Sequence, residues 1–431
     1  MLFSYNKLIE LANLKATPEE VSSAITSIGF EVEGIENFSK VEGIKFGKVL
    51  ELSKNPNDNK LTVVKIMFDN GNKIIQTTAT NLKLNDVVIA FVPGSSNGEF
   101  TFSSKELKGV LSEGMLSNIN EFGIKKDLLP EYMYEGIGTF NEINDLSIDP
   151  IEYLGLNDFI IEVSVLSNRS DVNSYLIMAR ELSSYFETEV NFNFEDLKVS
   201  GKTKNSFSFK EHELSKISLV ETSENISLNM KQKMMIIKSG ITLNKNDMIN
   251  VSNLIFILSG QPTHVYDSEI LNSKILEVKK INGKANILGN KIVEFNNSQV
   301  IFDGKEAVSV AGIVGIQKFS VSDKTKKYLF EFGIFNNYEV RKTSKMIKTN
   351  TNSGNQSGKK LGLGTKEIAI KILSILLKGN HSTVFYNYKN KPKKTFFIKY
   401  EYLNKIAGED FRKNKKFPDL IKKLTKLGFI F

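Results

Sequence analysis

The chain has 431 residues, 41% of them hydrophobic, a formal net charge of +8 and no cysteine. The lack of cysteine excludes disulfide bonds and thiolate metal sites, and it fits a reducing compartment. No apolar run predicts a signal peptide or a membrane span, so we expect a soluble, cytoplasmic protein. A chain of this size can bury more than one core, and we expect two to four domains.

The opening of the chain predicts a small unit of strands and helices. Thr17-Pro-Glu-Glu20 is typical of a capping box with proline at the first helical position, and Gly29 should end that helix. Two stretches, Met1-Leu-Phe-Ser-Tyr-Asn-Lys-Leu8 and Gly29-Phe-Glu-Val-Glu-Gly-Ile-Glu36, resemble the start of the beta subunit of bacterial phenylalanyl-tRNA synthetase. That resemblance implies a small α+β domain at this end of the chain.

Residues 44–123 predict a small β-barrel. Short apolar runs are separated by the turn formers Asn70-Gly71 and Pro93-Gly94, without a long helical pattern. Two stretches, Lys54-Asn-Pro-Asn-Asp-Asn-Lys60-Leu61 and Lys105-Glu-Leu-Lys-Gly-Val-Leu-Ser-Glu-Gly-Met115-Leu-Ser117, resemble the signature stretches of the OB-fold tRNA-binding domain of some aminoacyl-tRNA synthetases.

The two signature stretches indicate how the barrel would work. The Asn-Pro-Asn turn should form a tight corner, while Gly109 and Gly114 should allow close backbone approach or unusual dihedral angles. The resemblance implies contact with tRNA through this part of the barrel. The candidate tRNA-binding residues are Lys54, Asn57, Lys60, Lys105, Lys108, Ser112 and Met115.

The residues after the barrel resemble the same family. Ser167-Asn-Arg-Ser-Asp171 precedes a helix that should bury Leu176, Ala179, Leu182 and Phe186 on one side. In the family the barrel is inserted into a small domain that is built from both flanks. Gly201 then opens a stretch rich in lysine, asparagine and serine, which predicts a linker.

The region from about 200 to 365 carries the candidate hydrolytic site. Asn246 to Ile255 predicts a helix, and Leu258-Ser-Gly-Gln-Pro-Thr-His-Val-Tyr-Asp267 predicts a turn that presents His264. These stretches, with Gly312-Ile-Val-Gly315 and Leu329-Phe-Glu331, resemble the editing pocket of the family. There the pocket hydrolyses tyrosine that was wrongly attached to the phenylalanine tRNA.

The chemistry of such a pocket suggests roles for five residues. A buried carboxylate such as Glu331 can accept a hydrogen bond from the phenol of tyrosine, whereas phenylalanine would leave it unpaired. A positioned water and oxyanion donors complete the site, and these roles are open to His264, Ser252, Asn253 and the Gly315 amide. Two alternatives stay open: His264 could be structural, and Glu331 could face solvent.

The pocket also departs from the family pattern. Asn250 stands where the family usually has an acidic residue, Ser252 where it has threonine, and Gly315-Ile316 where it has a Gly-Gly pair. The family's Arg-Phe-Glu-Arg-Gly stretch is replaced by residues 350–360, which predict a flexible polar loop. We therefore expect an altered, degenerate editing pocket.

The last 91 residues are strongly basic. Residues 341–431 contain 22 lysine and arginine residues against 5 acidic residues, a local charge of +17, while residues 1–340 carry -9. This end is a candidate phosphate-binding surface with strongly salt-dependent binding. A generally lysine-rich composition is the alternative, although it does not explain the local scarcity of acids.

The C-terminal end resembles the start of a helical family domain. Pro418 should open a helix that Gly428 ends. Family members continue past the position of Phe431 through a pseudo-catalytic domain, which docks the alpha subunit and holds the magnesium-binding acids. The chain is thus expected to be either a fragment or a naturally shortened subunit.

The combined expectation is a multidomain α+β chain with an inserted OB-fold barrel. The expected parts are a split α+β domain (1–39 plus 149–195), the tRNA-binding barrel (40–148), a B3/B4 editing-like domain (200–390) and the incomplete start of a B5-like domain (391–431).

The expected function is that of a non-catalytic beta subunit of phenylalanine–tRNA ligase. We find no phosphate-binding loop and no metal ligands, so ATP and magnesium would be bound elsewhere in the holoenzyme. The expected partners are tRNA and the alpha subunit, in a family that forms tetramers of two alpha and two beta subunits. The alternatives are a stand-alone tRNA-binding protein and a free-standing tRNA deacylase.

Overall fold

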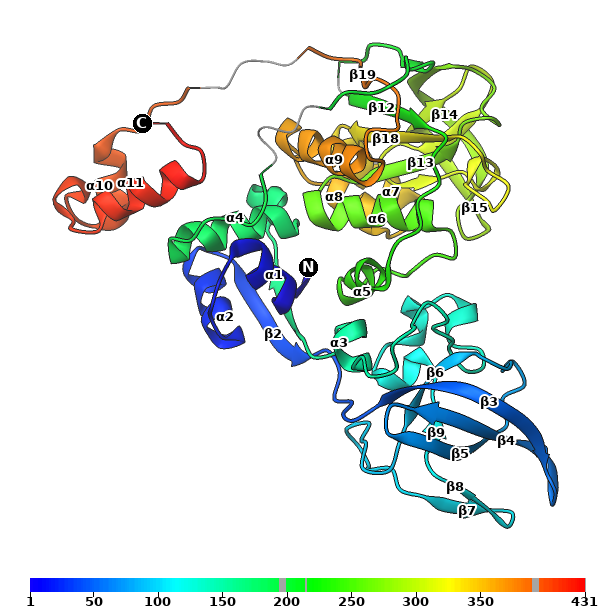
Figure 1. Ribbon diagram of the computed structural model, residues 1–431. Coiled ribbons are helices and arrows are strands. Elements are labelled where there is room, and N and C mark those ends of the chain that lie inside the picture. Colours follow the sequence, from blue (N-terminus) through cyan, green and yellow to red (C-terminus); the bar gives the residue numbers. More distant parts are fainter. Residues whose placement is uncertain (194–198, 214, 390–394, 431) are drawn as a thin grey trace. The chain divides into compact units, whose positions relative to one another are not determined.

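The computed structural model describes residues 1–193, 199–213, 215–389 and 395–430 (Figure 1). Backbone contacts divide the chain into two compact units. Unit 1 contains Met1–Asn6, Glu33–Val163 and Ser227–Asn250, and unit 2 contains Lys7–Val32, Ser164–Ile226 and Val251–Phe431. Helices and strands are mixed in both units, which confirms the α+β class. No helix in these described ranges is long and apolar enough to cross a membrane.

Strands from both flanks of the barrel form one small sheet. Its order is β1-β10-β2, with β1 at Leu2–Ser4, β10 at Phe159–Ser164 and β2 at Glu31–Asn37. β1 and β10 are antiparallel, and the register places Phe3 opposite Ile161. Both side chains are fully buried, which explains why the first residues of the chain are held in place.

A buried carboxylate, Asp158, ties this sheet to its neighbours in unit 1. It accepts hydrogen bonds from the Ser4 hydroxyl at 2.5 Å and from the Asn6 amide at 2.9 Å. The Lys238 ammonium, at the end of helix α5 (Met230–Lys238), lies 2.8 Å from the same carboxylate. The side chains of Lys238 and Asp158 are only 8% and 0% exposed, so the ion pair is shielded from solvent.

A curved five-stranded antiparallel sheet occupies residues 45–116. Its order is β5-β4-β3-β6-β9, with β3 at Lys45–Asn55, β4 at Asp58–Phe68, β5 at Gly71–Thr77, β6 at Val87–Phe91 and β9 at Met115–Leu116. Just before β9, the Glu113 amide donates to the Ile74 carbonyl at 2.7 Å, so this part of the chain lies beside the edge strand β5. The expected run of short strands is therefore present.

The inner face of this sheet follows the two-residue period of β-strands. On β4, Val64, Ile66 and Phe68 are buried, while Lys65 and Met67 between them keep contact with solvent. The enclosed apolar cluster consists of Val49, Val64, Ile66, Phe68, Ile75, Val88, Ala90 and Leu116. A separate hairpin, β7 (Lys105–Leu107) with β8 (Val110–Ser112), lies between β6 and β9 in the sequence.

Short helical segments complete unit 1. They are η1 at Ile119–Phe122, η2 at Lys126–Leu128, η3 at Glu131–Met133 and α3 at Pro150–Leu154, besides α5. Asn118 caps η1 and Asp149 caps α3, each by accepting a backbone hydrogen bond.

Two of the helices near the start of unit 2, α2 and α4, are predicted from the sequence. The helical segments are α1 at Tyr5–Ala12, α2 at Pro18–Ser27, η4 at Ser167–Val172 and α4 at Tyr175–Phe186. Thr17 and Glu20 make both hydrogen bonds of the expected capping box. On α4, Leu176, Ala179 and Leu182 are buried as predicted, whereas Phe186 is only partly buried.

Two sheets form the core of unit 2. The first has the order β13-β18-β12-β19, with β12 at Lys216–Thr222, β13 at Thr263–Asp267, β18 at Tyr328–Ile334 and β19 at Phe385–Tyr386. The second has the order β11-β14-β15-β16-β17, with β11 at Ser208–Phe209, β14 at Ile275–Ile287, β15 at Lys291–Phe302, β16 at Ala307–Val310 and β17 at Val314–Gly315. The segment η5 (Gln317–Phe319) follows β17.

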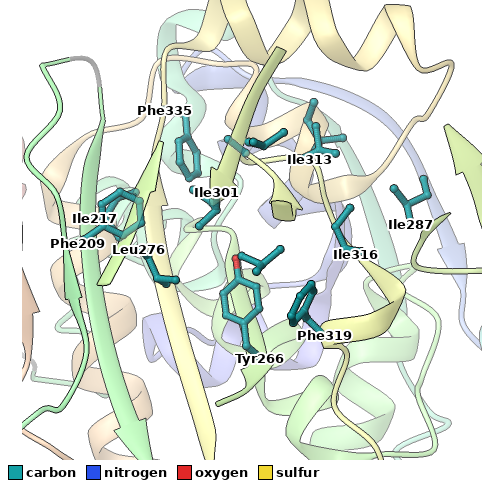
Figure 2. Close-up of a cluster of buried hydrophobic side chains, with 14 of the residues drawn as sticks. Phe209, Ile217, Tyr266, Leu276, Ile287, Ile301, Ile313, Ile316, Phe319 and Phe335 are labelled. Atoms are coloured by element: carbon teal, nitrogen blue, oxygen red, sulfur yellow. The ribbon is translucent and has the colours of Figure 1, made fainter. Parts of the chain in front are cut away.

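Side chains from both sheets meet in one apolar cluster (Figure 2). Ile217 and Tyr266 come from the first sheet, while Ile301 comes from the second. Four helices belong to the same region, namely α6 at Asp247–Ser259, α7 at Asn337–Met346, α8 at Asn352–Ser357 and α9 at Leu363–Leu376. The predicted helix after Asn246 is thus present as α6, and α9 packs along β18.

The predicted flexible loop at residues 350–360 is wrong, because this segment contains helix α8 and is packed. Thr351 caps the helix by accepting a hydrogen bond from the Gly354 amide at 2.9 Å. Gln356 is 2% exposed, and its amide donates to the backbone carbonyls of Ser170 at 2.8 Å and Gly260 at 2.9 Å. A polar composition therefore serves buried hydrogen bonds here.

The predicted linker at Gly201 is also wrong for its described part. The Lys202 amide donates to the His381 carbonyl at 2.8 Å, and Thr203 forms a parallel bridge with Ser382. A Cβ atom at Gly201 would lie 2.2 Å from the Ser382 carbonyl, so glycine permits this close approach. The chain here is an edge of the packed unit.

The C-terminal segments form a small helical module. Its helices are α10 at Tyr400–Ala407, η6 at Phe411–Lys413 and α11 at Phe417–Lys426. Pro418 lies in the first turn of α11, and Gly428 follows the helix with φ of +92°, as predicted. The expected domain boundaries at residues 195, 390 and 391 lie outside the described residues.

The Asp158–Lys238 pair should contribute strongly to the stability of unit 1. We predict that Lys238→Met lowers the free energy of unfolding by about 3 kcal/mol. The substitution removes the charge but keeps a long, unbranched side chain, so it leaves the buried Asp158 carboxylate without its counter-charge. Urea unfolding, with hydrogen exchange of the β10 backbone amides as the probe, would measure this change in the free energy of unfolding. The matched control is Lys65→Met, whose exposed pair with Glu51 should contribute less than about 1 kcal/mol. Equal effects of the two substitutions would contradict the prediction.

Candidate functional site

The tip of the barrel joins the two stretches that the sequence singled out. The Asn57 side chain, in the β3–β4 turn, donates to the Lys108 carbonyl in the β7–β8 turn at 3.0 Å. Lys108 and Gly109 have positive φ values of +52° and +77°, as a tight two-residue hairpin turn requires. The two turns therefore form one continuous surface.

A network of buried side-chain amides holds the two turns of this surface in place. Gln76 on β5 donates through Nε2 to the carbonyls of Leu107 at 3.0 Å and Val110 at 2.8 Å. Its Oε1 accepts from the Asn55 side chain at 2.7 Å, and Asn55 is 1% exposed. Gln76 thus links the base of the Asn-Pro-Asn turn to both strands of the β7–β8 hairpin.

The predicted tRNA-binding residues divide into an exposed and a buried group. Five are exposed, namely Lys54, Asn57, Lys60, Lys105 and Lys108. Ser112 is buried. Its hydroxyl donates to the Gly114 carbonyl at 3.0 Å and accepts from the backbone amide of Gln76 at 3.0 Å. Met115 is partly buried on β9. Ser112 therefore holds the hairpin, and the four lysines supply the positive charge of the surface.

Gly114 is required by the geometry of the barrel. Its φ is +135°, and a Cβ atom there would lie 2.3 Å from the Phe91 carbonyl oxygen. The expectation of close backbone approach at this glycine is confirmed.

Part of the positive charge of the basic C-terminal module is paired with acidic residues of unit 2. Lys426 lies 3.0 Å from Glu189, and Lys422 pairs with Glu187. Lys413 and Arg412 both lie within 4 Å of Asp410. The net excess of lysine remains, but these pairs reduce the free charge that a polyanion could meet.

The second candidate site lies between the two sheets of unit 2. The register of β13 and β18 places His264 directly opposite Glu331, so their side chains lie on the same face. Tyr266, two residues after His264, shares that face. The rings of His264 and Tyr266 meet edge to face, with centroids 4.3 Å apart.

The facing strands supply Ser309 and Gly315, which are opposite each other in the β16–β17 register. A Cβ atom at Gly315 would lie 2.5 Å from His264 Cε1 and 2.7 Å from Nε2, so the imidazole rests directly against this glycine. The structure therefore brings together three of the predicted pocket residues, His264, Gly315 and Glu331.

Glu331 is buried rather than solvent-facing, with 4% exposure. Its Oε2 accepts a hydrogen bond from the Tyr266 hydroxyl at 2.6 Å, and that hydroxyl lies 2.8 Å from Ser309 Oγ. Figure 2 shows the Tyr266 hydroxyl pointing into the centre of the apolar cluster. Tyr266 was not among the predicted site residues, although its two-residue spacing from His264 was a usable signal.

Desolvation shifts both ionisable groups towards their neutral forms; Glu331 is buried and His264 is partly exposed. Desolvation raises the pKa of Glu331 from its ordinary 4.5 to about 7, although the Tyr266 hydrogen bond opposes the shift. Desolvation lowers the pKa of His264 from 6.5 to about 4, so the imidazole is neutral at pH 7. A neutral imidazole can accept a proton from water, which is the property a general base needs.

The other predicted pocket residues lie on α6. Ser252 is 6% exposed and Asn253 is partly exposed. Asn250 is fully buried and its side chain donates to the Asn244 carbonyl at 2.8 Å. Asn250 therefore holds the turn before α6 in place.

A cavity of about 510 Å³ lies elsewhere in unit 2. Its lining includes Lys202, Lys204, Glu221, Lys327 and His381, and it includes neither His264 nor Glu331. Both ring nitrogens of His381 have hydrogen-bond partners within the protein: Nδ1 lies 2.7 Å from the Ser382 carbonyl, and Nε2 lies 2.8 Å from Ser374 Oγ.

The altered stretch at residues 350–360 contributes to the wall of the candidate pocket. Thr351 Oγ1 donates to the Ile313 carbonyl at 2.8 Å, and Ser353 donates to the Gly312 carbonyl at 3.2 Å. These contacts anchor the turn that leads to Gly315. Residues 350–360, which differ from the family pattern, therefore have a structural role in this chain.

The opposite pKa shifts of Glu331 and His264 should appear in the pH dependence of stability. Between about pH 4.5 and 7 the folded chain keeps a proton on Glu331 that the unfolded chain has released, so this group makes the free energy of unfolding fall as pH rises. His264 acts in the opposite direction between about pH 4 and 6.5.

We predict that Glu331→Gln removes only the first contribution. The free energy of unfolding of this variant should rise more steeply with pH than that of the parent, by on the order of 2–3 kcal/mol between pH 4.5 and 6.5. Urea unfolding at half-unit pH steps would measure both curves, with the exposed Glu51→Gln as control. Parallel curves for parent and Glu331→Gln would show that Glu331 titrates normally.

Comparisons with known proteins show what this chain is similar to. Residues 214–379, which include the strands β12 to β18, match the family model described as B3/4 domain. A phenylalanine–tRNA ligase beta subunit of Mycoplasmopsis pulmonis (strain UAB CTIP) is 38% identical over 440 residues, covering 100% of this chain and 60% of the relative. The beta subunit of Mycoplasma mobile is 35% identical, covering 100% of this chain and 59% of the relative.

One solved structure is similar along most of the chain. It is an N-terminal fragment of the phenylalanyl-tRNA synthetase beta-subunit of Pyrococcus horikoshii, with 10% identity, a TM-score of 0.37 and coverage of 98% of this chain and 88% of that chain. A TM-score of this size does not establish a common arrangement of the whole chain. The sequence relatives carry the conclusion, and the chain spans about 60% of their length. This chain is therefore similar along its whole length to the beta subunits of phenylalanine–tRNA ligase.

Proposed function

We propose that this chain acts as part of a phenylalanine–tRNA ligase beta subunit, which supports ATP-dependent attachment of phenylalanine to its tRNA. The single observation that carries the proposal is the 38% identity to such a subunit over the full chain. The barrel tip supports it, because two turns that are joined by a hydrogen bond, together with the strands beside them, carry four exposed lysines.

The proposed domain organisation follows from this role. The curved sheet with its β7–β8 hairpin is an OB-fold tRNA-binding domain (40–148), inserted in a split α+β domain (1–39 plus 149–195). The two sheets of unit 2 form a B3/B4 domain (200–390), and α10 to α11 begin a B5-like domain (391–431). The strand order β5-β4-β3-β6-β9 and the match over residues 214–379 support these assignments.

The synthetic reaction needs a partner. We propose that an alpha subunit activates phenylalanine and that ATP and magnesium bind outside this segment, in a heterotetramer of two alpha and two beta subunits. Within the described part of the chain, no group of three or more histidine, cysteine or carboxylate side chains is placed to hold a metal ion. No residue named here is therefore assigned to magnesium. Co-purification with the alpha subunit tests the partnership.

The barrel tip should bind tRNA mainly through charge. We predict that replacing Lys54, Lys60, Lys105 and Lys108 by alanine weakens tRNA binding and reduces the slope of log affinity against log salt by about 3–4, because each lysine that neutralises a phosphate releases about one counterion. Filter binding between 50 and 300 mM salt would measure the slope.

The matched control removes the same charge from the surface of unit 2. It replaces the exposed residues Lys284, Lys305, Lys324 and Lys326 by alanine. An equal loss of slope in the two variants would mean that tRNA binding depends only on total charge. An unchanged slope in the barrel variant would move the binding surface to the basic C-terminal module.

A second candidate function is hydrolysis of tyrosine from mischarged phenylalanine tRNA. The meeting of His264, Gly315 and Glu331 on facing strands favours it. In the proposed step, neutral His264 takes a proton from water while the water oxygen attacks the ester carbonyl carbon. The bond between that carbon and the ribose oxygen breaks, the ribose oxygen receives the proton, and the Gly315 amide stabilises the oxyanion. Ser252 and Asn253 are proposed to line the approach to this site.

The deacylase proposal depends on the imidazole. We predict that His264→Ala lowers the rate of tyrosine release from tyrosyl-tRNA by roughly 10²-fold or more, the usual contribution of a general base. The measurement follows release of labelled tyrosine by the full chain, and His212→Ala serves as control because His212 lies outside the cluster. Equal rates for parent and His264→Ala would place any deacylase site elsewhere.

A further inference from the structure

The centre of the unit 2 core contains a chain of three polar groups. Ser309 on β16, Tyr266 on β13 and Glu331 on β18 are joined through the Tyr266 hydroxyl, at 2.8 Å and 2.6 Å. All three are buried, with exposures of 6%, 0% and 4%. None of these contacts is needed to hold β13 and β18 together, because their backbones already pair over five residues.

The direction of the hydrogen bonds follows from the chemistry of the groups. A phenol has one proton, and the Tyr266 hydroxyl donates it to Glu331 Oε2. Ser309 therefore donates to the phenol oxygen. Among the described residues, Tyr266 is the side chain that Glu331 has as hydrogen-bond partner. The acceptor that could read the phenol of a bound tyrosine already holds a phenol from the chain itself.

This pairing changes the energy of discrimination. A site rejects an analogue that lacks a hydroxyl strongly only when the analogue leaves a buried polar group unpaired. Since Oε2 of Glu331 is paired before any ligand arrives, bound phenylalanine leaves this oxygen paired. The pocket then gains little from the phenol of tyrosine.

The fold also keeps Tyr266 in position. Its ring packs against the His264 ring at 4.3 Å and belongs to the apolar cluster between the sheets. Gly315 closes the other side of His264. Withdrawal of the phenol would therefore require the two sheets to separate.

We propose that Tyr266 is the specificity-determining residue of this pocket, an internal phenol that occupies Glu331 and suppresses selection of tyrosine over phenylalanine. The proposal rests on the proposed deacylase function of the same site. It states that the carboxylate is intact and that one hydroxyl group masks it. Removal of that hydroxyl should restore the ability to distinguish the two amino acids.

The decisive variant is Tyr266→Phe, which removes the hydroxyl and keeps the ring. Tyr328→Phe is the matched control, because Tyr328 is equally buried on β18 and its hydroxyl donates to the Thr325 carbonyl at 3.0 Å, away from Glu331. The full chain is incubated with tyrosyl- and phenylalanyl-tRNA, and the ratio of the two hydrolysis rates is compared. Thermal unfolding confirms that each variant is folded.

We expect Tyr266→Phe to raise the preference for the tyrosyl ester about tenfold, and the double variant Tyr266→Phe with Glu331→Gln to cancel the gain. Tyr328→Phe should leave the ratio within about twofold of the parent. A ratio that Tyr266→Phe leaves unchanged would overturn the proposal, as would an equal rise in Tyr328→Phe.

A binding measurement separates this inference from the deacylase proposal. If no variant hydrolyses either ester, the deacylase function is wrong, and calorimetric titration with tyrosinamide and phenylalaninamide tests Tyr266 directly. A tenfold gain in preference for tyrosinamide in Tyr266→Phe supports the masked carboxylate. The same preference in parent and variant overturns it.

Discussion

A carboxylate that leaves water must find hydrogen-bond donors inside the protein, and both units of this chain are built around that requirement. Asp158 is surrounded by a hydroxyl, backbone amides and the Lys238 ammonium, and it holds segments together that are far apart in the sequence. Glu331 accepts from the neutral hydroxyl of Tyr266, its donor among the described residues, and its pKa rises to about 7. The first acid serves architecture, while the second keeps a titratable group beside a neutral imidazole.

Buried amides meet the same requirement in another way. The Gln76 side chain joins the Asn-Pro-Asn turn to the β7–β8 hairpin, and the Gln356 side chain joins α8 to the carbonyls of Ser170 and Gly260. Each amide has donors and an acceptor, so it can satisfy several backbone groups at once. The exposed lysines of the barrel tip and the wall of the unit 2 pocket both depend on such an amide.

The sequence predicted local structure well wherever the signal was local. The capping box at Thr17, the buried side of α4, the helix after Asn246 and the glycine at position 114 depend on neighbouring residues or on backbone geometry, and they are present in the structure. Periodicity and turn chemistry carry this information.

The sequence failed where polar residues are satisfied by distant partners. Residues 350–360 and the stretch after Gly201 have the composition of loops, but their hydrogen bonds reach residues 170, 260 and 381–382. Nothing within either stretch encodes those partners. Tyr266 was missed although its two-residue spacing from His264 places both side chains on one face of a strand, because its hydrogen-bond partner Glu331 lies 65 positions further along the chain.

The packing of α8 has a practical consequence for labelling this protein. A polar stretch with two glycines invites the insertion of a tag or a fluorescent loop, yet an insertion between Thr351 and Gln356 would break the capping bond or pull the buried amide away from its carbonyls. The β4–β5 turn offers the opposite environment, since Gly71 has open space around it and its neighbour Asn70 is exposed. A probe placed there would report on the barrel and leave its fold intact.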